Sequence, residues 1–154
     1  MTPNKKTGQI NMLDFIAILE THKRDFSDEI LNSFCADREF SWHWIPPKGR
    51  SGGILIGVNQ HTFLIENVNL GEFHIKLHVK NKCDGFRWVH VAVYGAAQPD
   101  HKELFLAEFV STCSNETMPL MVGVILILSE TRYKKTMIGM MIDGQPCLML
   151  VLNL

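Results

Sequence analysis

The sequence predicts an α/β fold in which helices pack on mostly antiparallel sheet, as in a layered sandwich. Short apolar or alternating runs, typical of strands, recur along most of the chain. Two segments instead space their apolar residues as a helix does, and Gly, Asn and Pro separate the runs. The order is strand, helix, a meander of about five strands, helix and strand, which favours a layered α/β architecture.

The first strand is predicted over Phe15–Leu19, an apolar run that ends at the carboxylate Glu20. Helical spacing follows over Phe26–Phe34, where Ser27 and the two acidic residues behind it suit a helix start. These two segments open the α/β order.

The meander is predicted from alternation and β-branched residues, over Phe40–Ile45, Gly52–Val58, Thr62–Val68, Glu72–Val79 and Arg87–Tyr94. Its first strand alternates around Trp42 and Trp44 and stops at the Pro46-Pro47 pair. A second helix is predicted over Asp100–Cys113 and a last apolar strand over Pro119–Leu128.

Composition indicates one globular domain, with 46% hydrophobic and 20% charged residues in a chain of 154. The net charge of −1 gives no overall basic field for nucleic acid. A local basic face remains an alternative, built from Lys48, Arg50, Lys80, Lys82 and Arg87, and would make the chain a nucleic-acid or protein binding module.

Four scattered cysteines without a C-x-x-C pair suit a reducing compartment, so we expect a nuclear or cytoplasmic location rather than secretion. The apolar run Met118–Leu128 is too short to span a bilayer, and Asp143, Gln145 and Pro146 interrupt the apolar stretch 136–154. We therefore expect no membrane association, and no small-molecule cofactor is evident.

Several residues have both a chemical and a structural interpretation. Glu20 is placed to bind a hard metal such as Mg²⁺ or to be a solvated acid, and the Tyr94 hydroxyl is placed to contact a phosphate or to be half-buried. The loop Lys48–Gly53 offers amides to a phosphate but lacks P-loop spacing, which favours a tight turn. His74 and His78 would lie about 13 Å apart in a strand, too far to share a metal.

Four strings together resemble the endonuclease domain of plant LINE-type retrotransposons: FIAILETHKRDFSDEIL, WHWIPPKGRSGGILIGVN, FRWVHVAVYGAAQ and KELFLAEFVSTCSNETMPLMVG. That domain belongs to the endonuclease/exonuclease/phosphatase superfamily, whose fold is DNase I-like. The resemblance covers residues 13–123.

The resemblance implies a four-layer α/β sandwich with two sheets face to face, and Mg²⁺-dependent cleavage of phosphodiester bonds in DNA. The family's metal-binding Glu in L-Q-E-T matches Glu20, with Leu19 in place of Gln. The catalytic Tyr of V-Y-G-P matches Tyr94, with Ala96 in place of Pro. Mg²⁺ and DNA are thus the expected cofactor and partner.

The family's G-G-D-F-N motif, which supplies a catalytic Asp and Asn, aligns with Gly123–Leu128. Ile125 then stands for the Asp and Ile127 for the Asn, and neither side chain binds metal or activates water. The family's W-N-x-R-G and S-D-H motifs also have no counterpart. We therefore expect a partial, truncated and inactive domain.

A frameshift just after Gly123 explains the replacement. Codons for Gly-Asp-Phe-Asn-Ile, such as GGT GAT TTT AAT ATT, become GTG ATT TTA ATA TT one nucleotide later, which encodes Val-Ile-Leu-Ile and then Leu or Phe. This matches Val124–Leu128. The domain is accordingly predicted over 13–123, and residues 124–154 are predicted to be an out-of-frame tail.

Overall fold

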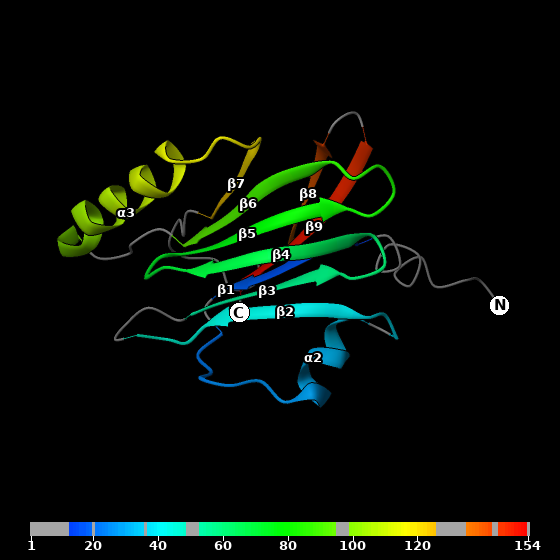
Figure 1. Cartoon of the computed structure of the whole chain (residues 1–154). Coiled ribbons are helices and arrows are strands. Elements are labelled where there is room, and N and C mark those ends of the chain that lie inside the picture. Colours follow the sequence, from blue (N-terminus) through cyan, green and yellow to red (C-terminus); the bar gives the residue numbers. More distant parts are fainter. Residues whose placement is uncertain are drawn as a thin grey trace.

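The computed structural model describes residues 13–19, 21–35, 37–48, 53–94, 99–125, 135–142 and 145–153, with backbone alone for residue 99 and from 124 onward. Two sheets lie face to face, α2 covers the outer face of one, and α3 covers the outer face of the other (Figure 1). The predicted class, a partial four-layer α/β sandwich with mostly antiparallel sheets, is confirmed.

The five-stranded sheet has the order β2-β3-β1-β9-β8. Its strands are β1 (Phe15–Leu19), β2 (Phe40–Ile45), β3 (Ile54–Asn59), β8 (Lys135–Ile142) and β9 (Gln145–Asn153). β1 pairs antiparallel with β3 on one side and parallel with β9 on the other. β1 is therefore the central strand of this sheet.

The four-stranded sheet has the order β4-β5-β6-β7. Its strands are β4 (Phe63–Leu70), β5 (His74–Asn81), β6 (Arg87–Tyr94) and β7 (Leu120–Ile125). β4, β5 and β6 are antiparallel, whereas β7 runs parallel to β6 after the crossover through η1 (Pro99–His101) and α3 (Lys102–Ser114).

Helix α2 (Asp28–Cys35) begins as its sequence predicts, with the Ile30 N–H donating to the Ser27 hydroxyl over 3.4 Å. The outward aromatic rings of β2 pack beside it: Trp42 lies 5.9 Å from Phe34 between ring centroids. The alternation in β2 thus turns its tryptophans toward the helix and away from the other sheet.

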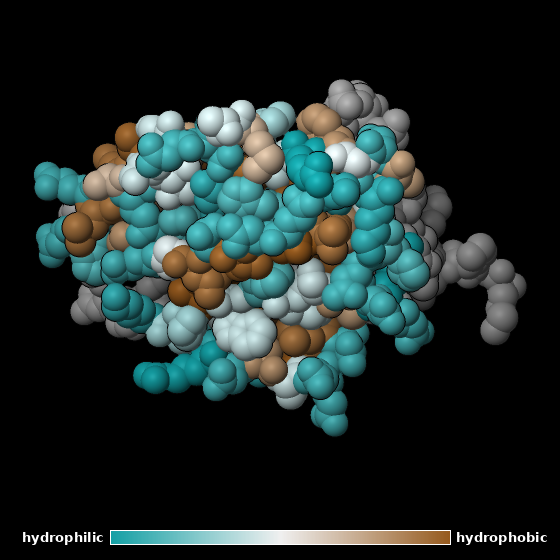
Figure 2. Space-filling model, viewed as in Figure 1, coloured by the Kyte–Doolittle hydropathy of each residue, from teal (hydrophilic) through white to brown (hydrophobic). Residues whose placement is uncertain are grey.

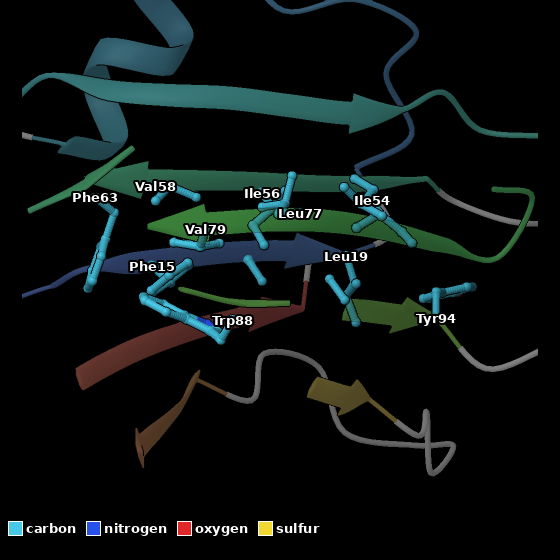
Figure 3. Packing of buried hydrophobic residues seen from close by; sticks show 13 residues of the cluster. Phe15, Leu19, Ile54, Ile56, Val58, Phe63, Leu77, Val79, Trp88 and Tyr94 are labelled. Carbon is cyan, nitrogen blue, oxygen red and sulfur yellow. The ribbon is translucent and has the colours of Figure 1, made fainter. Parts of the chain in front are cut away.

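The main core lies between the sheets. The strands β1, β3, β5 and β6 meet there through side chains that include Leu19, Ile56, Leu77 and Trp88 (Figure 3). On the outer side of the second sheet, the valines of β6 form a smaller cluster with Phe105 and Phe109 of α3. At the edge strand β4, Leu64 and Leu70 stay exposed, and Figure 2 shows a hydrophobic band across this face.

The predicted meander is wrong in one respect, because its strands divide between the two sheets after β3. The connection from β3 to β4 has only three residues, 60–62, which is typical of a hairpin. β3, however, already has β2 on one edge and β1 on the other, so β4 has no free edge to join and enters the second sheet.

The sequence also did not predict β8 and β9, which lie in the expected out-of-frame tail. Their presence does not test the reading frame, so the boundary at 123 stays a prediction. No helix among the described residues is long and apolar enough to cross a membrane.

Replacing Gly57 with alanine is expected to lower the free energy of unfolding by about 1–3 kcal/mol. A Cβ there would lie 2.5 Å from a Trp42 ring carbon, since the two residues are direct partners across β2 and β3. Urea denaturation followed by tryptophan fluorescence measures the loss.

Combining Gly57→Ala with Trp42→Leu should recover part of this loss relative to Trp42→Leu alone, because the smaller side chain makes room for the new methyl group. An identical loss in both backgrounds would contradict the steric explanation.

Candidate functional site

The carboxyl ends of β1 and β6 lie at the same end of the sandwich. Figure 3 shows Leu19, Ile54 and Tyr94 at this end of the core, with Phe63 and Trp88 at the other. β7 ends there too, since Ile125 is the register partner of Tyr94. The structure therefore brings together strand ends to which the resemblance assigns chemistry.

The loop between β2 and β3 closes on the segment after β1. Gly53 has a φ of +86°, a conformation that disfavours residues with a Cβ. A Cβ would also lie 2.8 Å from the Ile45 carbonyl oxygen and 3.0 Å from Oγ1 of the buried Thr21. Gly53, the last glycine of the G-R-S-G-G string, is thus required by a close approach of backbone at the candidate site.

Lys48, at the start of this loop, forms an ion pair with Glu72 of the β4–β5 turn, with 3.3 Å between Nζ and Oε1. The Lys48 side chain is 78% exposed, so the pair contributes little stability. Residues 49–52, including Arg50, lie outside the described residues.

Glu108 of α3 holds the β4–β5 turn next to Tyr94. Its carboxylate accepts hydrogen bonds from the Glu72 N–H (3.1 Å) and the Phe73 N–H (3.0 Å), and it contacts the His74 ring. The Tyr94 N–H in turn donates to the Phe73 carbonyl over 2.9 Å. One carboxylate therefore fixes the backbone that positions the end of β6.

A second acid, in the connection between α3 and β7, also contacts the outer face of β5. The ammonium of Lys76 lies 2.8 Å from Glu116, and the His78 ring lies 3.5 Å from the same oxygen. The hydrogen bond from Lys76 lowers the pKa of Glu116 below its ordinary value. His74, Lys76 and His78 alternate along β5 and so share its outer face, a pattern that the sequence contains.

Sequence reasoning considered His74 and His78 only as metal ligands and missed their carboxylate partners. Those partners lie about 35 residues along the chain, at |i−j| of 34 for His74 and Glu108. The signal that could have found them is the basic alternation of β5, followed by a helix that carries acids. His74 attaches α3 to the sheet, and His78 contacts the connection that follows the helix.

Tyr94 has its side chain in the main core, where it is 4% exposed. Its proposed catalytic role is not tested by this burial and stays a prediction. Glu20 and Ile127 lie outside the described residues, and only the backbone of Ile125 is described.

The described residues at this end do not form a Mg²⁺ centre. Among the described residues, no three His, Cys, Asp or Glu side chains lie together as a metal site. Mg²⁺ prefers carboxylate and other oxygen ligands, and Ile125, which pairs with Tyr94, offers none at the position aligned with the family's Asp. Glu20 alone is the sequence's candidate acid here.

The expected basic face is partly neutralised. Arg87 lies 3.0 Å from Glu66, an ion pair that lowers the pKa of that carboxyl group, and Lys48 has Glu72. The Lys82 ammonium donates to the Gln60 carbonyl. These contacts leave less unpaired positive charge than the sequence suggests.

A groove of about 530 Å³ lies elsewhere, between the edge strands β2 and β4. Ser41 and His43 line one side of it, and Ile65 and Val68 line the other. None of the residues that the sequence assigns to catalysis or metal binding lines it.

Two face-to-face sheets with a helix on each outer face resemble, in partial form, the fold of the endonuclease/exonuclease/phosphatase superfamily. The structure is similar to the catalytic domain of human nocturnin, a member of this superfamily that was solved with a bound sulfate anion. The TM-score is 0.53 at 13% sequence identity, and the match covers 71% of this chain and 49% of that one.

The chain thus spans about half of the nocturnin domain, and at this identity the likeness shows the fold alone. No family model matches the sequence. No curated protein matches it either. Superfamily members typically use Mg²⁺ and act on nucleic acids or other phosphoesters.

Removing the Glu108 carboxylate by Glu108→Ala is expected to lower the free energy of unfolding by about 1–3 kcal/mol, because the part-buried Phe73 N–H loses its acceptor. Amide hydrogen exchange should also speed up at residues 72–74 and at Tyr94.

Glu103→Ala is the matched control, since Glu103 is an exposed acid in the first turn of the same helix. If both substitutions change stability and exchange equally, Glu108 is not a specific clamp on the turn.

Proposed function

We propose that this chain is a catalytically inactive domain of the endonuclease/exonuclease/phosphatase type, derived from the DNA-cleaving endonuclease of a plant LINE-type retrotransposon. The observation that carries the proposal is the apolar residue Ile125 at the strand end beside Tyr94, where the aligned family motif has its catalytic Asp. The shared fold makes the ancestry plausible in physical terms, and the motif strings supply the specific lineage.

The chemistry of the family explains why this replacement abolishes activity. Phosphodiester cleavage with Mg²⁺ needs oxygen ligands for the metal and polar groups that orient the attacking water. Ile125 and Ile127 supply neither function. Loss of a single group of this kind typically costs several kcal/mol of transition-state stabilisation, and here two are replaced.

The same interpretation of the motif supports a frameshift after Gly123. The apolar string Val124–Leu128 is then the family's coding sequence translated one nucleotide out of frame. Translation inside a plant cell suits the free thiols of the three cysteines whose side chains are described, so we place the product in the nucleus or cytoplasm.

No nicking of supercoiled plasmid DNA is expected from the purified chain in Mg²⁺, and Glu20→Ala should behave identically. A Mg²⁺-dependent nuclease of known activity, assayed in parallel, verifies the substrate. Nicking by the unaltered chain above the level of Glu20→Ala would show that the centre still works, and would refute the proposed inactivity.

The genomic DNA around the Gly123 codon is expected to encode G-D-F-N in the neighbouring frame. Sequencing the locus checks this directly. If no frame there encodes the motif, the frameshift is wrong, and the substitutions at Ile125 and Ile127 need another origin.

A further inference from the structure

A histidine lies at the centre of the sandwich, between the two sheets. His90 of β6 is 0% exposed. Its ring centroid is 5.1 Å from that of Phe15 on β1, at an interplanar angle of 31°. The imidazole therefore occupies a position that an aliphatic side chain would ordinarily fill.

The surroundings of His90 offer no polar contact. Neither ring nitrogen has a hydrogen-bond partner among the described residues, and the nearby Trp88 indole nitrogen is also without one there. Its register partners on the flanking strands are both apolar: Leu77 belongs to the main core, and the partly buried Met121 packs against it.

Among the described side chains, no charged group faces the ring from the strands packed around it. β1 presents Phe15 and Ala17 to this core, and β5 presents Ile75, Leu77 and Val79. The sequence of β9, the neighbour of β1, has Cys147 as its one titratable residue. A proton on His90 would therefore have no described counter-ion, and an isolated buried charge is strongly disfavoured.

We propose that His90 is an acid-sensitive switch in the core: mild acidity favours the opened chain, in which the ring takes up a proton, over the packed sheets, in which the ring stays neutral. The proposal rests on the position of the ring and is independent of whether the chain is a nuclease remnant.

Burial lowers the pKa of His90 from the ordinary 6.5 to about 4. Between these two values the folded chain keeps His90 neutral, whereas the unfolded chain takes up the proton. The contribution of neutral His90 to the free energy of unfolding is therefore fully present above about pH 6.5, and it is lost as the pH falls toward about 4.

Other histidines must be separated from this effect. His43 is half-buried beside the β2–β4 groove, and burial lowers its pKa as well, so it acts in the same direction. His74 and His78 face Glu108 and Glu116. The pH dependence of unfolding in the unaltered chain contains contributions from several histidines. The difference in pH dependence between the unaltered chain and a His90 variant isolates the contribution of His90.

The test is urea unfolding of the full chain at about pH 7 and about pH 5, compared with His90→Leu and His90→Gln. The unfolding equilibrium constant of the unaltered chain should rise on acidification roughly twenty-fold more than that of either variant. Leucine restores an apolar core, and glutamine keeps a neutral polar group, so two variants guard against a simple packing defect. His61→Gln, at an exposed position, should retain the full pH dependence.

A second measurement follows the imidazole directly. The ¹⁵N shifts of His90 in the folded chain should report a neutral ring down to about pH 5. Equal acid sensitivity in all four proteins, titration of the folded His90 at an ordinary histidine pH, or absence of any cooperative unfolding transition would each overturn the proposal.

Discussion

The two-sided burial of β1 and β3 is the constraint from which the rest of the fold follows. Every residue of both strands is buried. In β1, Phe15, Ala17 and Leu19 enter the core between the sheets, whereas Ile16 and Ile18 enter the cluster under α2. A sheet with apolar residues on both faces needs cover on both, so α2 must pack on one side and the second sheet on the other.

This layering also creates the candidate site. Because β1 and β6 belong to different sheets that meet face to face, their carboxyl ends, at Leu19 and Tyr94, lie at one end of the core. The β2–β3 loop closes on the same end through Gly53, and Glu108 fixes the turn beside it. The layering, the β2–β3 loop and the Glu108 contacts thus gather at the strand ends to which the resemblance assigns chemistry.

The sequence predicts the local elements well and their partners less well. β1, β2 and β6 begin and end where their apolar runs do, because alternation and flanking turn residues are local signals. The move of β4 into the second sheet was not predictable, since it depends on β1 already occupying the edge of β3. The same limit applies to Glu108, whose partners are defined only when α3 lies across β5.

The candidate site residues show the same difference between local signals, which the sequence contains, and packing, which it does not. Motif strings point to strand ends, and the register of Tyr94 with Ile125 agrees with that placement. His90 was not singled out, because a single histidine in an alternating strand gives no sign of its burial until the two sheets are packed together. The free-energy cost of burying this imidazole depends on the apolar side chains around it, and the sequence alone does not show which these are.

Fold and chemistry make different demands on the same residues, which explains how a chain can keep one and lose the other. A catalytic Asp needs its own oxygen atoms, whereas a strand needs only a side chain that fits a pleated, buried surface. Isoleucine at 125 has no side-chain oxygen, yet the backbone of β7 stays paired with β6 up to that residue. The same holds for β9, an apolar string that pairs with β1 along five residues. Strand pairing tolerates many sequences that are apolar and partly β-branched. If the residues after Gly123 are translated out of frame, this composition explains how they can still complete the two sheets.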